Sequence, residues 1–174
     1  IANITDLADT SKLPPPQTPV LRSPDGKRAA IVSTMRFPAF GAHVVQSFID
    51  YHLAVGFVHL YLFFDDPSDL SVGHASSYSK DQVTVTTHDA YLRERWKKCG
   101  SYQQLAPFID DEVQARQHLN CEIAMELALS DYHYVDWLLH IDSDELFHTE
   151  KTSVVEHFQH LWNDGVYQMT YLNH

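Results

Sequence analysis

Three carboxylates follow one hydrophobic run of the sequence, a pattern that could hold a metal ion. Asp142, Asp144 and Glu145 come directly after the run at 137–141, and the chain turns apolar again at Leu146. We expect 137–141 to form a buried strand that continues into the acids, where alternate side chains project to the same side. Asp142 and Asp144 would then reach one ion, and oxygen ligands suit Mg²⁺ or Mn²⁺ better than Zn²⁺. A polar turn that caps the next helix would have the same composition.

A second group of acids follows another hydrophobic run. Asp65, Asp66 and Asp69 come directly after the strand that we expect at 58–64. In an open α/β sheet, ligands bind in the crevice outside the carboxyl ends of the strands. Two acidic strand ends therefore favour a ligand site over a simple turn.

The elements that must position these acids alternate along the chain. Short hydrophobic or β-branched runs predict strands at 29–33, 58–64, 83–87, 137–141 and 166–172. Amphipathic spacing predicts helices at 44–55, 111–129 and 153–162. The second helix is expected to carry acids in its first turn, and Gly56 is expected to end the first helix. Strands that alternate with helices predict an α/β fold with a Rossmann-like, mostly parallel open sheet.

Composition limits the classes of function. The chain has 174 residues, of which 44% are hydrophobic, enough for one domain with a core. Its net charge of −11 argues against nucleic acid and against an anionic membrane surface as partners. No apolar run approaches the roughly 18 residues of a membrane span. Membrane attachment would therefore need an anchor upstream of residue 1.

The amino-terminal residues differ in composition from the rest. Residues 1–28 are rich in proline and predict an extended stem or linker, whereas 29–174 form the α/β domain. Asn3 begins an N-glycosylation sequon, which, if used, indicates the secretory-pathway lumen of the Golgi or ER. Cys99 and Cys121 could form a disulfide there, and two free thiols are an alternative of at least equal weight.

Three motifs in a fixed order resemble the donor-binding half of glycosyltransferases with the GT-A fold. The first is YHLAVGFVHLY at 51–61, the second is DDPSD at 65–69, and the third is DWLLHIDSDELF at 136–147. They are similar to motifs of family 92 and related family-2-like transferases. The resemblance covers 29–174 and implies a nucleotide-sugar-binding domain that is truncated before the acceptor half.

The resemblance also implies a role for individual residues. Asp142 and Asp144 would hold Mn²⁺ or Mg²⁺ at the donor diphosphate, with Asp144 the direct ligand and Glu145 in support of the turn. The residues that would contact the nucleotide are Thr34, Arg36, Asp65, Asp66, Arg116 and Asp142. The implied activity is metal-dependent transfer of a sugar from a UDP- or GDP-linked donor to a glycan, a glycoprotein or another hydroxyl acceptor. The resemblance assigns no catalytic base within this chain.

Two other classes of function fit parts of the pattern. In a phosphatase of the haloacid-dehalogenase type, Asp142 would be the nucleophile and Asp144 the general acid. Such enzymes carry this motif on their first strand and need a later Lys, whereas here the motif is late and only Lys151 follows. A non-catalytic module that binds a nucleotide or a partner is the second alternative.

Two expectations concern residues near these motifs. His140 lies in the hydrophobic run and is expected to be a hydrogen-bonded core residue rather than a metal ligand. Tyr91, Trp96 and Tyr102 are expected to form an exposed aromatic surface for an acceptor or a partner.

Overall fold

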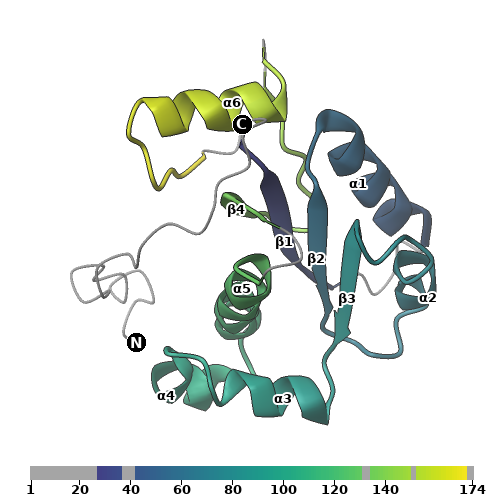
Figure 1. Ribbon diagram of the computed structural model, residues 1–174. Coiled ribbons are helices and arrows are strands. Elements are labelled where there is room, and N and C mark those ends of the chain that lie inside the picture. Colours follow the sequence, from purple (N-terminus) through teal and green to yellow (C-terminus); the bar gives the residue numbers. More distant parts are fainter. Residues whose placement is uncertain (1–26, 37–41, 131–133, 150–151, 172–174) are drawn as a thin grey trace.

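A parallel sheet between two layers of helices forms the centre of the computed structural model (Figure 1). The structure describes residues 27–36, 42–130, 134–149 and 152–171, so nearly all of the predicted stem lies outside the described residues. The elements are β1 (Ala29–Met35), α1 (Ala42–Val55), β2 (His59–Phe64), α2 (Ser71–Ala75), β3 (Val83–Thr87), α3 (Ala90–Trp96), α4 (Tyr102–Leu105), the 3₁₀ turn η3 (Ala106–Phe108), α5 (Val113–Ala128), β4 (Trp137–His140) and α6 (Val154–Asn163).

The four described strands are all parallel, in the order β3-β2-β1-β4. Val32 of β1 pairs with Tyr61 of β2 on one side and with His140 of β4 on the other. Because the strands are parallel and in this register, β2, β1 and β4 end at the same edge of the sheet. The α/β class with an open parallel sheet is therefore confirmed, and both acidic motifs follow strands that end at this edge.

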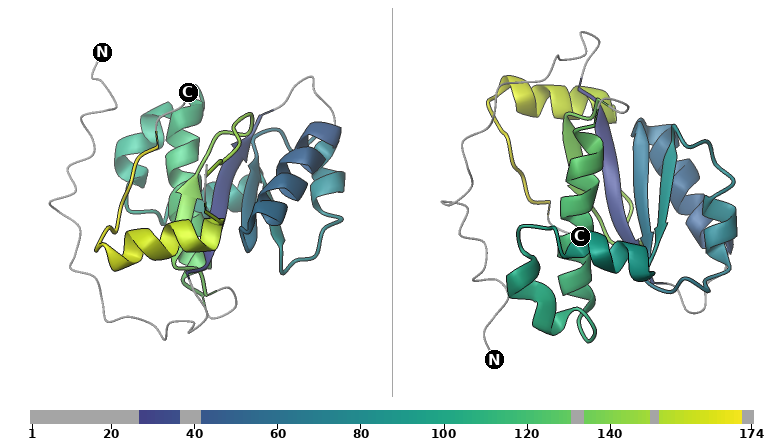
Figure 2. Two further views of the ribbon diagram at one scale, coloured as in Figure 1. Left: turned by 90° about the horizontal axis from the view of Figure 1, so that it is seen from above. Right: turned by 60° about the horizontal axis from the view of Figure 1, so that its bottom comes forward.

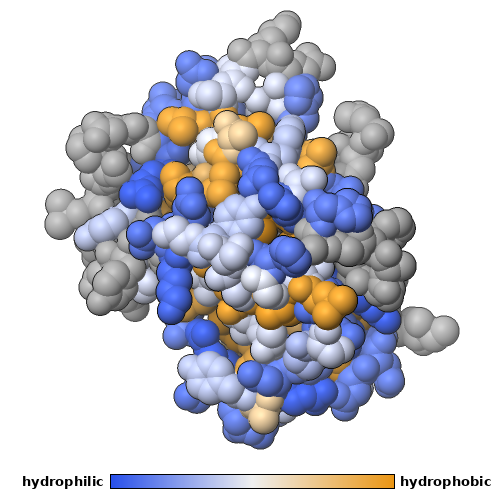
Figure 3. Space-filling model, turned by 90° about the vertical axis from the view of Figure 1, so that its right-hand side faces the viewer, coloured by the Kyte–Doolittle hydropathy of each residue, from blue (hydrophilic) through white to orange (hydrophobic). Residues whose placement is uncertain are grey.

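Helices cover both faces of the sheet (Figures 1 and 2). Alternate strand residues such as Ile31 and Leu60 pack under α1, α2 and α6, whereas Val32 and Tyr61 pack under α3, α4 and α5. All residues of β1 and β2 are buried, as expected for parallel strands that are covered on both faces. On the face of the molecule that carries α1 and α2, hydrophobic residues form small groups separated by hydrophilic ones (Figure 3).

Local signals explain where the helices begin and end. Gly56 follows α1 with φ of 112°, a left-handed conformation that favours glycine and ends the helix, as predicted. Ser153 and Glu156 form a capping box at the start of α6, with the Ser153 side chain accepting from the Glu156 backbone N–H at 3.2 Å. No helix in the described ranges has both the length and the apolar character that a membrane crossing requires.

Several predicted features differ from the structure. The predicted strand at 137–141 is not buried: β4 lies at the edge of the described sheet and its residues are half-buried or, at His140, exposed. His140 is therefore not a core residue. The acids predicted in the first turn of the long helix precede it instead, because the extended backbone of Glu112 (φ −115°, ψ 121°) makes that residue the N-cap.

The strand predicted at 166–172 is absent from the described residues 166–171. Gly165, with φ of 73°, ends α6, and the backbone N–H of Val166 donates to the carbonyl of Leu161 at 2.9 Å. The chain therefore leaves the helix still bonded to its last turn. In the described residues, β4 pairs only with β1.

The two cysteines are free thiols rather than a disulfide in this structure. Both pack against the core cluster that α3 and α5 share with the sheet. Burial raises the pKa of Cys99 to about 11 and that of Cys121 to about 12, so both thiols are protonated at neutral pH.

Candidate functional site

Two neighbouring residues of α5 contact the two acidic strand ends. Arg116 donates two hydrogen bonds to the carboxylate of Asp65, from Nε to Oδ1 at 2.6 Å and from Nη2 to Oδ2 at 2.7 Å. Gln117 donates from Nε2 to Oδ1 of Asp142 at 2.8 Å. The first two turns of α5 thus link the end of β2 to the end of β4.

The acidic motif after β4 is a turn rather than a continuation of the strand. The backbone N–H of Glu145 donates to the carbonyl of Asp142 at 3.1 Å, and the backbone N–H of Asp142 donates to Glu145 Oε2 at 3.2 Å. The prediction that Asp142 and Asp144 alternate along a strand is wrong, because ladder pairing with β1 stops at His140. Both aspartates are exposed, whereas Glu145 is half-buried and braces the turn.

Tyr51 and His52 of α1 hold the chain that leaves this turn. The Tyr51 hydroxyl donates to the carbonyl of Phe147 at 2.9 Å, and the backbone N–H of Phe147 donates to His52 Nε2 at 3.2 Å. His52 Nδ1 lies 2.8 Å from the carbonyl of Phe48 and donates to it in this tautomer. Burial lowers the pKa of His52, which keeps the ring neutral as this bonding requires. The first sequence motif therefore supports the third, a role that the sequence did not reveal.

The carboxylate of Asp65 lies in a largely buried ion pair. The side chains of Asp65 and Arg116 are 12% and 7% exposed, and Arg116 Nη1 also donates to the carbonyl of Ile109 at 2.6 Å. His88 Nδ1 lies 3.6 Å from Asp65 Oδ1. Burial, together with the nearby charge of Arg93, lowers the pKa of His88, so Arg116 supplies the main positive charge beside Asp65.

Thr34 and Arg36, at the end of β1, have different environments. Thr34 is buried and its hydroxyl accepts from Asn120 Nδ2 at 2.9 Å, while Asn120 Oδ1 accepts from Trp96 Nε1 at 2.9 Å. This chain of hydrogen bonds ties β1 to α5 and α3. Arg36, one residue beyond the strand, is exposed. A ligand can therefore reach the Arg36 side chain more readily than that of Thr34.

The predicted aromatic surface is not formed as expected. Trp96 is only 1% exposed because its ring packs in the core and its N–H bonds to Asn120. Tyr91 is 70% exposed, and Tyr102 is half-buried. The three aromatic residues therefore do not share one exposed patch.

Asp66 and Asp69 shape the loop after β2. Oδ1 of Asp66 accepts from the backbone N–H of Ser68 at 2.8 Å and from the Ser68 hydroxyl at 2.7 Å, and these bonds lower the pKa of Asp66. Oδ1 of Asp69 accepts from the backbone N–H of Ser71 at 2.7 Å. Asp66 is exposed and ionised at neutral pH.

The donor set of the acidic turn fits a metal ion that arrives with a phosphate ligand. The carboxylate of Asp144 has no hydrogen-bond partner among the described residues, and Asp142 is bonded through one oxygen to Gln117. No group of three or more His, Cys, Asp or Glu side chains in the described ranges is arranged to hold a metal ion. Mg²⁺ commonly binds through one or two carboxylates together with substrate phosphates. Asp142 and Asp144 can supply the first part of such a set.

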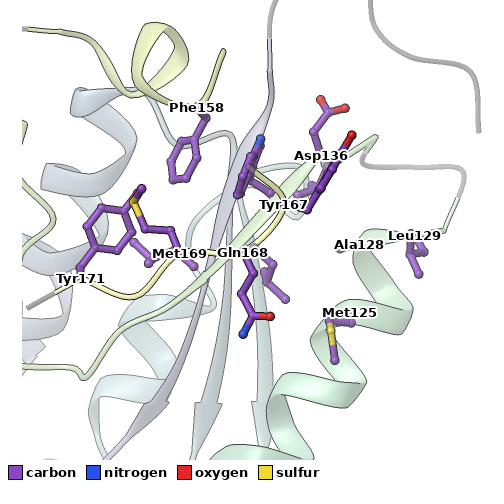
Figure 4. Close-up of a pocket in the computed structure, with 13 residues that line it drawn as sticks. Met125, Ala128, Leu129, Asp136, Phe158, Tyr167, Gln168, Met169 and Tyr171 are labelled. Atoms are coloured by element: carbon purple, nitrogen blue, oxygen red, sulfur yellow. The ribbon is translucent and has the colours of Figure 1, made fainter. Parts of the chain in front are cut away.

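A cavity of about 480 Å³ lies elsewhere, beside β4 (Figure 4). Its lining comes from the last turn of α5, from β4 and its preceding residues, from α6, and from 166–171. Most of these side chains are apolar, and the carboxylate of Asp136 is paired with Lys27 at 3.1 Å. The cavity lies toward the end of α5 that is remote from Gln117, so it is separate from the acidic turn.

Comparison of the chain with protein-family models, with curated proteins and with solved structures finds no match. A functional assignment therefore depends on the geometry of the carboxyl edge of the sheet and on the order of the sequence motifs.

Proposed function

We propose that this chain binds a nucleotide-diphosphate sugar together with Mn²⁺ or Mg²⁺, as the donor domain of a glycosyltransferase. The sugar would pass from a UDP- or GDP-linked donor to a glycan, a glycoprotein or another hydroxyl acceptor. The observation that carries the proposal is the meeting of two acidic strand ends at the start of α5, through the bonds from Arg116 to Asp65 and from Gln117 to Asp142. Ligands of open α/β sheets bind at this edge.

Each group at the edge has a distinct task in this proposal. Asp144 and Asp142 would hold the ion against the donor diphosphate. The ion would offset the negative charge that develops on the leaving nucleoside diphosphate. Asp66 and Arg36, both exposed, are available to the nucleotide, whereas Asp65 and Arg116 form the wall behind it.

Calorimetry with UDP and with GDP, each with and without Mn²⁺, tests the donor site. We expect metal-dependent binding of one nucleotide, and loss of that binding in Asp144→Asn, because the amide removes the charge without changing the size of the side chain. Asp81→Asn is the matched control, since Asp81 is an exposed acid at the opposite edge of the sheet, before β3. Metal-independent binding, or equal binding by Asp144→Asn, would contradict the proposal.

The two alternative functions give different outcomes. Release of phosphate from a phosphomonoester, abolished by Asp142→Asn, would identify the phosphatase. Nucleotide binding without hydrolysis or transfer of the sugar would identify a binding module.

A further inference from the structure

Gln117 bonds to the acidic turn without neutralising it. Its amide donates to Oδ1 of Asp142 at 2.8 Å, whereas Arg116, one residue earlier, neutralises Asp65 through two charged hydrogen bonds. An amide is an uncharged donor, so this bond adds no positive charge beside Asp142. On α5, Arg116 thus compensates the charge of Asp65, whereas the next residue, Gln117, orients Asp142.

Gln117 is half-buried on α5, so it can hold Asp142 in a fixed direction from outside the turn. The hydrogen bond uses one carboxylate oxygen of Asp142 and leaves the other for a ligand. Within the turn, Glu145 Oε2 accepts from the backbone N–H of Asp142 at 3.2 Å. Asp142 is therefore fixed at its backbone by the turn and at its side chain by α5.

We propose that Gln117 is a positioning residue that orients Asp142 toward a divalent metal ion, an inference that rests on the donor site proposed above. Partners that orient metal-binding carboxylates raise metal affinity because the ligand is already in place when the ion arrives. The neutrality of the side chain matters equally, because a cation at this position would repel the ion. Residue 117 must therefore meet two separate requirements: it donates a hydrogen bond to Asp142, and it carries no charge.

Two variants separate these demands. Gln117→Met keeps the length of the side chain and removes the donor. Gln117→Lys keeps a donor that can bond to Asp142 and adds a positive charge. If Gln117 only stabilised the turn, Gln117→Lys would bind Mn²⁺ with unchanged affinity. If residue 117 lies beside a bound ion, the positive charge of the lysine lowers the affinity for that ion.

The measurement is the dissociation constant of Mn²⁺ at saturating UDP, and at saturating GDP, from the electron paramagnetic resonance signal of free Mn²⁺. With the nucleotide that binds, we expect about a tenfold weaker constant in Gln117→Met and a loss at least as large in Gln117→Lys. Gln159→Met is the matched control, since Gln159 is also half-buried on a helix but its amide donates to Asn163 of the same helix, at 2.9 Å, rather than to the acidic turn. Its Mn²⁺ constant should equal that of the unaltered chain. Circular dichroism checks that all variants are folded.

The outcomes distinguish this inference from the function on which it rests. If the unaltered chain binds Mn²⁺ with nucleotide and either Gln117 variant binds it equally well, the positioning role is wrong while the donor site stands. If the unaltered chain binds no Mn²⁺ with either nucleotide, the donor site and the positioning role are both wrong.

Discussion

Asp65 shows how a residue at a ligand-binding edge can also be part of the fold. Its carboxylate is paired with Arg116 in a position where both side chains are largely buried. Removal of one partner from such a pair leaves an unpaired buried charge, whereas pairs on the surface contribute little. The pair therefore joins β2 to α5 whether or not a nucleotide contacts it.

Replacement of Arg116 tests this structural role. Arg116→Leu is expected to lower the free energy of unfolding by about 3 kcal/mol, because Asp65 is left buried without its partner. Arg93→Leu is the control: Arg93 pairs with Asp110 at 2.7 Å, but the two side chains are 46% and 76% exposed. The control should lose much less stability, because a pair this exposed is screened by solvent. Urea denaturation measures both values, and equal losses would show that burial of the pair is unimportant.

At the scale of elements, the sequence predicted best those segments whose conformation and ends depend on their own residues. The strand at 83–87 has the predicted bounds, and Gly56 ends α1 as expected. The exposure of β4 and the path of 166–171 were predicted wrongly. Hydrophobicity indicates that a segment avoids water, but its neighbour in the sheet depends on contacts that are remote in sequence.

Prediction of the candidate site from the sequence is limited in the same way. Acids at two strand ends were visible in the sequence, because their position follows from the local pattern. The turn geometry of Asp142 was not, and neither was the contact with Gln117, 25 residues away. The bonds from Tyr51 and His52 to Phe147 span 96 and 95 residues. The local spacing of residue types cannot predict contacts between residues so far apart in the sequence.

The hydrogen bond between His52 of α1 and Phe147, just after the acidic turn, predicts that the stability of the fold depends on pH. His52 accepts from Phe147 only when its ring is neutral, and burial lowers its pKa below the ordinary value near 6.5. The unfolded chain therefore binds the proton more readily, so the contribution of His52 to stability is complete above about pH 6.5 and declines as the pH falls toward the folded-state pKa. Titration of the His52 ring by NMR should give a pKa below 6.5. A pKa above 6.5 would contradict the neutral acceptor.

At the scale of the whole molecule, the net charge of −11 opposes folding through repulsion among acids. Any divalent cation can relieve this repulsion without occupying a specific site. Stabilisation by Mn²⁺ alone is therefore weak evidence for a metal centre. The general effect of charge must be separated from the effect of the acidic turn.

Thermal unfolding can make this separation. An increase in NaCl from 0.01 M to 0.15 M shortens the screening length from about 30 Å to about 8 Å, so the melting temperature should rise equally in the unaltered chain and in Asp144→Asn. At constant ionic strength, Mn²⁺ together with the nucleotide that binds, each near 100 times its dissociation constant, should add roughly 5–10 °C in the unaltered chain alone. The variant lacks one of the two carboxylates of the site but retains almost all of the molecular charge. An equal additional rise in Asp144→Asn would mean that the ion acts through the overall charge rather than at the turn.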